Sequence, residues 1–341
     1  MKSRNVILFF ILLLIVIFLF IIDIFFGSVN YSFNEIIQVF LNTNKVDNII
    51  RTTIFDFRLP KAITAILVGI ALSLSGLQMQ TVFRNPLAGP YVLGISSGAS
   101  LGVALVVLGL SPFLAHTAMS IIGNTSIVFA AIMGSCAVLF LILMVSFRIK
   151  DIMTILILGI LFASATSAIV SILQYFSKET LLKAYVIWSM GSLADVTKSR
   201  LVFLSIFTAI GIIMTMVSAK TLNALLLGEI YAKSMGVNIT SSRIIIFIST
   251  GIMAGTVTAF CGPIGFIGII IPHITRMAFK TSNHFIIIPG SILIGAAIMV
   301  LSDLISQLPG TGSNLPINSV TAMIGIPIVI WIIYKRKKIS M

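Results

Sequence analysis

Acidic residues are scarce in this chain, and so are charged residues in general. Asp and Glu number 9 among 341 residues, against 22 Lys and Arg, and charged residues together make up 9%. Soluble domains carry roughly 25% charged residues, whereas this chain is 58% hydrophobic with a mean hydropathy of +1.17. No soluble core could bury that much apolar surface, so the sequence indicates a protein whose solvent is the lipid bilayer.

Motifs of enzymes are also missing. The sequence has no Gly-x4-Gly-Lys-Ser/Thr loop, which excludes nucleotide binding by that route. Its 3 His and 2 Cys show no metal-ligand spacing, and Cys136 and Cys261 fall within apolar runs, where they are expected to pack as small apolar side chains. We therefore expect no catalytic residue, no metal site and no cofactor.

Long apolar runs occupy most of the chain. A spanning helix needs about 20 mostly apolar residues, and the alternating pattern of a membrane β-barrel is absent. We predict an all-α membrane protein with one transmembrane domain over residues 1–341, a compact bundle of about ten helices. The expected spans are residues 7–26, 62–81, 92–110, 126–147, 153–174, 200–218, 243–260, 264–279, 286–305 and 317–334.

The basic residues predict how the chain lies in the membrane. Lys and Arg accumulate in cytoplasmic loops, and both the start of the chain (Lys2, Arg4) and the tail at 335–338 are basic. Ten spans return both termini to one side, so both are expected in the cytoplasm. The net charge of +13 then reflects topology and does not indicate nucleic-acid binding. The N-terminal run exceeds a typical signal-peptide core and no Ala-x-Ala site follows, which favours a retained helix.

Two polar stretches are expected on the outside. In residues 27–60, Ser32-x-x-Glu35 forms a capping-box pattern before apolar residues at helical spacing, which predicts a short amphipathic helix at the membrane surface. Residues 175–198 would form a short re-entrant or interfacial element.

The remaining polar stretch, residues 219–242, is expected in the cytoplasm. Its apolar spacing predicts two short helices, broken near Gly228 and Gly236. Elsewhere, small residues recur at four-residue spacing, which lets helices approach closely. The runs 62–80 and 244–260 each lead to a Gly-Pro pair and are expected to have opposite orientations, as a weak inverted repeat predicts.

Several long motifs occur in the order typical of a known family. They are Phe57-Arg58-Leu59-Pro60-Lys61, then Arg84-Asn85-Pro86-Leu87-Ala88-x-Pro90-x-x-Leu93-Gly94, then Leu227-Gly228-Glu229-x-x-Ala232-x-x-Met235-Gly236-Val237, and finally Pro272-His273-x-x-Arg276. Together they resemble the signature of FecCD-type permeases, which import iron complexes, haem and cobalamin. The resemblance covers about residues 30–335. Arg84, Asn85, Pro86, Gly94, Pro272, His273 and Arg276 are its main motif residues.

The resemblance implies the permease subunit of a type II ABC importer in the bacterial plasma (inner) membrane. It implies several partners: a second copy of the chain, separate ABC ATPase subunits, an outer solute-binding protein, and membrane lipid. The substrate would be a metal chelate, a ferric siderophore before haem or cobalamin, moved inward by alternating access. The chain itself would be no enzyme, because the ATPase subunits would hydrolyse ATP.

The resemblance and the residue pattern together give candidate site residues. ATPase coupling is expected at Leu225, Leu226, Gly228, Glu229, Ala232, Met235 and Gly236. Arg58 and Lys61 are expected to contact acidic residues of the binding protein, unless they anchor the chain at lipid headgroups. Ser164, Ser167 and Ser171 would line the substrate pathway, with simple helix packing as the other interpretation.

The sequence also departs from the family pattern. Asn314 stands where the family often has an acidic residue, and Gln307 stands where it has an outer basic one, which weakens the inference of a second outer contact. The alternative function is a secondary transporter or channel for a small solute. Such a protein usually needs ionisable residues in mid-span, whereas Asp23 and Asp303 lie near span ends.

Overall fold

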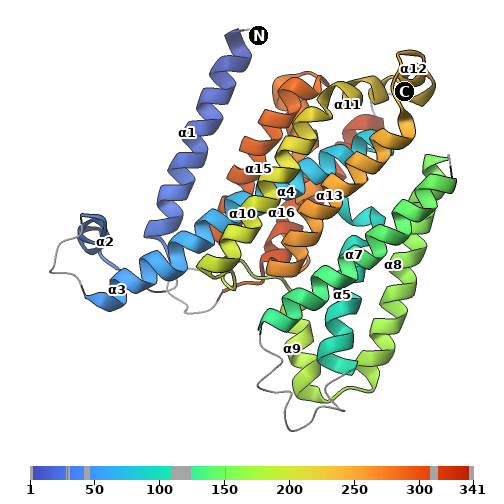
Figure 1. Cartoon of the computed structure of the whole chain (residues 1–341). Helices are drawn as coiled ribbons and strands as arrows, with labels where there is room; N and C mark the ends of the chain where they lie inside the picture. The colour runs from blue at the N-terminus through green and yellow to red at the C-terminus, as the bar shows by residue number, and fades with distance from the viewer. Residues whose placement is uncertain are drawn as a thin grey trace.

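The computed structural model describes residues 3–27, 29, 31–41, 47–109, 124–149, 151–307 and 314–337. Every regular element in these ranges is a helix (Figure 1). The long helices are α1 (Ser3–Phe25), α4 (Leu59–Val82), α7 (Asn124–Arg148), α8 (Ile152–Tyr175), α10 (Lys198–Val217), α13 (Ile239–Cys261), α15 (His284–Ser306) and α16 (Ile317–Lys337). The shorter elements are α2 (Phe33–Phe40), α3 (Asn48–Thr52), η1 (Thr53–Arg58), η2 (Pro90–Leu93), α5 (Ile95–Ala104), η3 (Leu105–Gly109), α9 (Glu179–Ser189), α11 (Ala219–Leu226), α12 (Glu229–Ser234) and α14 (Ile267–Phe279).

The apolar helices follow the expected runs. In the described residues, 7 helices are long and apolar enough to cross a membrane, and three shorter apolar stretches, Ile95–Gly109, Ile267–Phe279 and Ile317–Ile332, coincide with further expected spans. The all-helical membrane fold is confirmed, while the number of spans stays a prediction.

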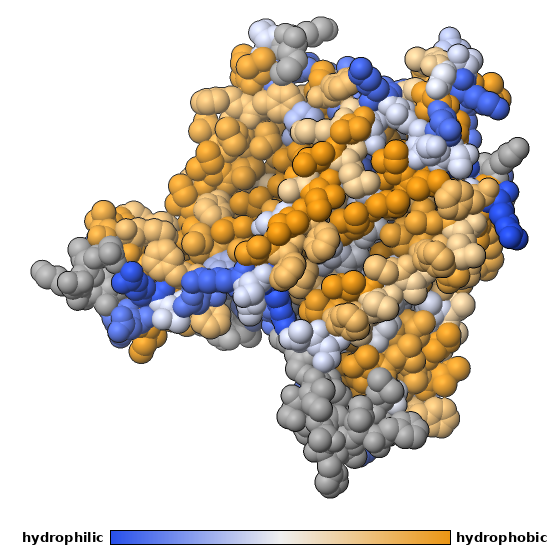
Figure 2. Space-filling model, viewed as in Figure 1, coloured by the Kyte–Doolittle hydropathy of each residue, from blue (hydrophilic) through white to orange (hydrophobic). Residues whose placement is uncertain are grey.

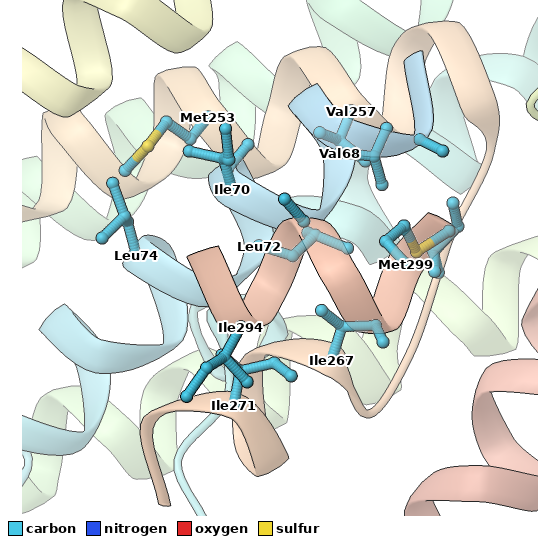
Figure 3. Close-up of a cluster of buried hydrophobic side chains, with 14 of the residues drawn as sticks. Val68, Ile70, Leu72, Leu74, Met253, Val257, Ile267, Ile271, Ile294 and Met299 are labelled. Carbon is cyan, nitrogen blue, oxygen red and sulfur yellow. The ribbon is translucent and has the colours of Figure 1, made fainter. Parts of the chain in front are cut away.

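Helix α4 is the centre of the bundle. Its apolar segment is 83% buried, against 11% for α1, and it contacts α13, α14, α15 and α10. Figure 3 shows its side chains Val68, Ile70, Leu72 and Leu74 among apolar side chains from α13, α14 and α15. Its burial and its contacts with four other helices therefore place α4 at the centre of the described bundle.

One contact brings two backbones together at this centre. A Cβ on Gly76 of α4 would overlap the carbonyl group of Gly268 in α14. Pro272 follows four residues later inside α14 and has no N–H, so it cannot make the usual helical bond to the Gly268 carbonyl. The carbonyl group is left facing the α4 backbone, and only glycine at position 76 leaves room for it.

Helix α14 is shorter than the expected span 264–279. It has 13 residues, which rise about 20 Å, less than the roughly 30 Å hydrocarbon layer. The backbone before it is irregular, because Gly262 has φ 74° and Phe266 has φ 66°. The helix therefore begins only at Ile267.

The chain is helical further upstream of α4 than expected. We expected the span to begin at residue 62, after an outer stretch over residues 27–60, but α3, η1 and α4 form one continuous helical run, Asn48–Val82. A proline ring clashes with the carbonyl four residues earlier in an α-helix. Here the π-helical turn η1, Thr53–Arg58, ends two residues before Pro60, so the backbone preceding the proline is not a regular α-helix.

Two polar zones flank the apolar surface. Figure 2 shows hydrophobic residues over most of this face, with hydrophilic ones gathered around α11 and α12 at one end and in a band near α3 at the other. Near the first end, Arg4 Nη2 donates to the Phe279 carbonyl at 3.0 Å. Near the second, Gln307 Nε2 donates to Asp23 Oδ1 at 2.8 Å. We call the first end the inner face and the second the outer face, following the predicted topology.

The predicted outer amphipathic helix is present as α2. Ser32 Oγ accepts the backbone N–H of Glu35, and the Glu35 carboxylate accepts the backbone N–H of Ser32 at 2.7 Å. The capping box is therefore confirmed, and Ile36 and Val39 are the buried side of the helix.

Candidate functional site

The inner face carries a pair of short helices, α11 and α12, joined at a sharp elbow. Gly228 forms the elbow with φ 107°, and Gly236 ends the pair with φ 83°. Both angles lie in a region that residues with a Cβ rarely adopt. The two predicted breaks are thus confirmed, and each requires glycine for its backbone conformation.

The side chains of this helix pair divide into a buried and an exposed set. Leu225 is 3% exposed and Ala232 is fully buried, together with Leu222. We expected Leu225 to face a partner, but it packs into the bundle interior. Leu226 is half-buried. The exposed apolar set, which we call the apolar tip, comprises Leu227 at 61%, Ile230 at 91%, Tyr231 at 60% and Met235 at 60%.

Of the apolar tip, only Met235 was predicted from the sequence as a coupling residue. Ile230 follows Glu229 directly and falls outside the apolar spacing from which the two short helices were predicted. The signal that could have identified Ile230 was its position, an isoleucine in a polar stretch expected in the cytoplasm, with no apolar residue four positions later.

Glu229 is fixed by an ion pair with Arg243 of α13. The Arg243 side chain is 4% exposed and that of Glu229 is 32% exposed. Beside the pair, α12, the start of α13 and the end of α7 enclose a cavity of about 590 Å³, which Lys233 also lines. The ion pair therefore holds α12 against the bundle, while Ile230 and Tyr231 stay exposed.

The motif residues of the first half lie next to this elbow. Arg84 has φ 49°, unusual for a residue with a Cβ, and its Nη1 is 3.4 Å from the position that a Cβ on Gly228 would take. Asn85 Oδ1 accepts the N–H of Leu87 at 3.0 Å, and Pro86 is half-buried in the same turn. The turn after α4 therefore contacts the elbow between α11 and α12.

Other motif residues hold helices together. Gly94, with φ 72°, is the N-cap residue directly before α5. Arg276 Nη1 donates to Gln80 Oε1 at 2.7 Å, and Gln80 Nε2 donates to the Ile269 carbonyl at 2.8 Å, which ties α14 to α4. Pro272 is buried at the contact described above, and His273 is half-buried.

Arg58, on the outer face, is directed into the protein. It is 8% exposed, and its Nη1 donates to the carbonyl groups of Ile24 and Phe25, each at 3.0 Å. Its Nη2 donates to the Val29 carbonyl. A cation is favourable at the C-terminal end of a helix, where carbonyl groups lack partners. Arg58 thus caps α1, and this geometry does not support the expected contact with a binding protein.

Lys61 is also engaged inside the chain. Its ammonium group lies 3.0 Å from Asp303 Oδ1, with side-chain exposures of 15% and 1%. Gln307 Nε2 lies 2.8 Å from Asp23 Oδ1 and 3.2 Å from Asp303 Oδ2. We call Asp23, Lys61, Asp303 and Gln307 the outer cluster. It joins α1, α4 and α15, so it does not favour a docking role for Lys61 either.

Accessible cations on the outer face lie elsewhere. Arg51 and Lys198 line an open cavity of about 410 Å³ with Phe55 and Asp56. The Lys198 side chain is 63% exposed and pairs with Asp56, whose side chain is 45% exposed. These cations were not singled out from the sequence, because only their exposure distinguishes them from Arg58 and Lys61.

The three serines of α8 share one face. Ser164, Ser167 and Ser171 are all exposed in the single chain. Ser164 Oγ donates to the Ile160 carbonyl and Ser171 Oγ to the Ser167 carbonyl, each at 3.0 Å. Packing inside this chain therefore does not explain them, and they present a weakly polar surface beyond it.

A buried polar group absent from our expectations lies within the bundle. Gln78 of α4 is fully buried. Its Nε2 donates to Thr215 Oγ1 at 2.5 Å and Ser249 Oγ at 3.0 Å, while Thr250 Oγ1 donates to Gln78 Oε1 at 2.8 Å. The network is uncharged and links α4, α10 and α13.

Comparison with known proteins shows what the fold and these motifs match. Residues 13–335 match the model of the FecCD transport family. The chain is 32% identical to the hemin transport system permease HmuU of Yersinia pestis, over 83% of each chain. It is 33% identical to the vitamin B12 import system permease BtuC of Escherichia coli, over 84% of each chain.

Solved structures agree with this match. An inward-facing structure described as a metal-chelate type ABC transporter superposes with a TM-score of 0.83 at 29% identity, covering 96% of this chain and 99% of that one. PsaBC from Streptococcus pneumoniae superposes with a TM-score of 0.53 at 17% identity and shares the fold.

Proposed function

Since this chain belongs to the FecCD transport family, and is thus a multi-pass inner-membrane permease subunit of an ABC importer, we propose that it carries a metal chelate inward by alternating access. A ferric siderophore is the first candidate substrate, on the resemblance of the sequence motifs to permeases for iron complexes. Haem and cobalamin are the others, because related permeases are named for hemin and vitamin B12. Separate ATPase subunits would supply the energy.

The observation that carries this proposal is the apolar tip of the inner helix pair. Ile230 is 91% exposed and Tyr231 60% exposed in a polar, cytoplasmic environment, where exposed apolar patches mark interaction sites. Glu229 and Arg243 hold α12 in place from behind. A rigid helix with an exposed apolar end suits insertion into a cleft of an ATPase subunit.

The pathway would lie where two copies of the chain meet. The serine face of α8 supports this, because Ser164, Ser167 and Ser171 are exposed and uncharged. The hydroxyl groups of Ser164 and Ser171 already donate to carbonyl groups of their own helix, so they would offer weak contacts to a passing chelate. Weak contacts suit transport, since a tightly held substrate is released slowly.

On the outer face, the accessible cations Arg51 and Lys198 replace Arg58 and Lys61 as the proposed contacts for an acidic surface of the binding protein. They line an open cavity of about 410 Å³. Charged groups at an interface rim steer association and lose this effect in salt.

A secondary transporter or channel is the less favoured function. Coupling to protons or cations usually relies on ionisable groups within the membrane. The buried polar network around Gln78 is uncharged, and Asp303 is paired with Lys61. These groups stabilise helix packing and offer no mobile charge.

Reconstitution tests the proposal. The full chain would be placed in liposomes with the ATPase and solute-binding protein encoded by neighbouring reading frames, and uptake of ferric siderophore, haem and cobalamin would be measured separately. We expect ATP-dependent uptake of one of them and none without the ATPase. Uptake driven by a proton gradient with this chain alone would overturn the proposal.

A further inference from the structure

The side-chain amide of Asn223, in α11, forms hydrogen bonds with residues at the start of another helix, α15. Its Oδ1 accepts the backbone N–H of His284, the first residue of α15, at 2.8 Å. Its Nδ2 donates to Asn283 Oδ1 at 3.0 Å, and Asn283 Oδ1 also accepts the N–H of Phe285 at 3.0 Å. The Asn223 amide is therefore built into the N-terminal cap of α15.

The His284 side chain extends this link to α4. It is 1% exposed, with Nδ1 2.9 Å from Asn223 Oδ1 and Nε2 3.0 Å from Thr81 Oγ1. An amide oxygen can only accept, so Nδ1 is the donor in the contact with Asn223. One imidazole ring thus connects the inner helix pair to the central helix of the bundle.

Thr81 is next to a second link. Gln80 binds both Arg276 Nη1 and the Ile269 carbonyl of α14. Through two successive residues, the inner end of α4 is therefore joined to α11, α14 and α15. Leu222 and Leu225 of α11 are also buried in apolar contacts with the same region. Apolar contacts allow a helix to slide, whereas directional hydrogen bonds fix its position.

We propose that Asn223 and His284 form a rigid joint that transmits displacement of the inner helix pair to α15 and α4. This inference rests on the proposed function and adds positioning residues to it. Coupling between distant sites requires a contiguous set of contacts that moves as a unit. The joint supplies that set, because α11 cannot shift without carrying the capped start of α15 and the Thr81 side chain with it.

The test separates ATP hydrolysis from transport in the reconstituted complex of permease, ATPase and binding protein. We expect Asn223→Ala to reduce uptake per ATP hydrolysed by about five-fold or more, the lower range of typical coupling factors, while basal hydrolysis persists. Asn223→Asp keeps the acceptor for the N–H and Nδ1–H of His284 but loses the donor to Asn283, so it should restore most of the coupling. Thr81→Val removes the bond between His284 and α4, together with the bond from Thr81 Oγ1 to the Leu77 carbonyl of its own helix, and should give an intermediate loss.

Asn238→Ala is the matched control. Asn238 lies in the same cytoplasmic stretch and caps α13, where its Oδ1 accepts the N–H of Ser241, three residues away in the same helix, at 3.1 Å. A merely structural role predicts similar losses of melting temperature and coupling for both alanine variants. The joint predicts similar melting temperatures but a coupling defect only in Asn223→Ala.

Two failures are distinguishable. A wild-type complex that shows no ATP-dependent uptake of ferric siderophore, haem or cobalamin contradicts the proposed function. A wild-type complex that transports, with Asn223→Ala and His284→Ala both retaining its uptake per ATP, contradicts the joint. Hydrogen exchange of the full chain in detergent gives a reading without partners: Asn223→Ala should speed exchange across α11, and unchanged rates there would also contradict it.

Discussion

Lys61 and Asp303 form an ion pair at 3.0 Å that joins the start of α4 to the end of α15, with the carboxylate only 1% exposed. Gln307 connects the same carboxylate to Asp23 of α1. Three helices separated widely in sequence are thus tied at the outer face by one cation, two carboxylates and one amide.

Removing the cation should destabilise the bundle. In Lys61→Met, the buried Asp303 carboxylate loses its cationic partner and keeps the amide contact with Gln307. Removing one member of a buried ion pair costs about 3–5 kcal/mol in comparable cases. Thermal unfolding in mild detergent would measure the loss. The double variant Lys61→Met/Asp303→Asn should recover more than half of it, because no unpaired carboxylate remains at position 303. Equal stability of the single variant and wild type would show that the pair contributes nothing.

Arg58 and the exposed cations should give opposite phenotypes. Arg58→Met leaves the Ile24 and Phe25 carbonyl groups at the end of α1 without this donor, so we expect a stability loss of about 2–6 kcal/mol, at roughly 1–3 kcal/mol for each of the two groups. Arg51→Glu with Lys198→Glu should leave stability nearly unchanged, slow association with the binding protein and alter its salt dependence. Surface plasmon resonance at several ionic strengths checks the second expectation. If Arg58→Met kept full stability but associated slowly with the binding protein, Arg58 would be part of the docking surface.

The apolar tip should be required for ATPase docking. Ile230→Asp places a charge on a side chain that is 91% exposed, so the permease should still fold, while stimulated ATP hydrolysis and co-purification with the ATPase should fall at least about ten-fold, as for an interface hot spot worth over 1.4 kcal/mol. Val217→Ser, which alters a 76% exposed residue at the inner end of α10, is the control. If Ile230→Asp kept the wild-type stimulation of ATP hydrolysis, the ATPase subunit would contact another part of the chain.

The serine face of α8 should be reachable from water. Each of Ser164, Ser167 and Ser171 would be changed to Cys in a Cys136→Ser background, because Cys136 is itself exposed. We expect a charged maleimide to label them in liposomes and labelled protein to lose uptake. Ile213→Cys, on the exposed face of α10, should stay unlabelled in lipid. Equal labelling at all four positions, or at none, would contradict a pathway along α8.

The α2 capping box should depend on pH. Hydrogen bonds from the backbone N–H and hydroxyl of Ser32 lower the pKa of the Glu35 carboxyl from its usual value. A carboxyl with a lowered folded-state pKa contributes stability above its unfolded pKa of about 4.3 and loses it as pH falls through the folded value. Hydrogen exchange of α2 should therefore be slow near neutral pH, after correction for intrinsic rates, and fast in acid. Glu35→Gln should remove this dependence.

The sequence predicted the apolar helices and the elbow glycines, because both follow from local rules. Apolar runs identify spans whatever packs around them, and Gly228 and Gly236 are breaks in a short amphipathic pattern. The capping box of Ser32 and Glu35 is likewise contained in four consecutive residues.

Side-chain direction was not predictable in the same way. Arg58 and Lys61 were predicted from the sequence to be cations available on the outer face. In the structure, Arg58 binds the carbonyl groups of Ile24 and Phe25, and Lys61 pairs with the Asp303 carboxylate. Such contacts depend on tertiary packing over long sequence separations. Gln307 looked like a departure from the family pattern, yet its amide joins Asp23 to Asp303. The Asn223–His284 contact was missed for the same reason.

The pairing of charges at the outer face has a consequence for biosynthesis. From Asp23 to Lys61 the sequence carries four acids (Asp23, Glu35, Asp47, Asp56) and four bases (Lys45, Arg51, Arg58, Lys61). On the proposed topology this segment crosses to the outside, and moving one net elementary charge against the membrane potential costs about 2.3 kcal/mol per 100 mV. A segment with no net charge crosses without that electrical work. Lys61 pairs with Asp303 only once the bundle has formed, whereas the balance within this segment already removes the electrical obstacle to exporting its four bases.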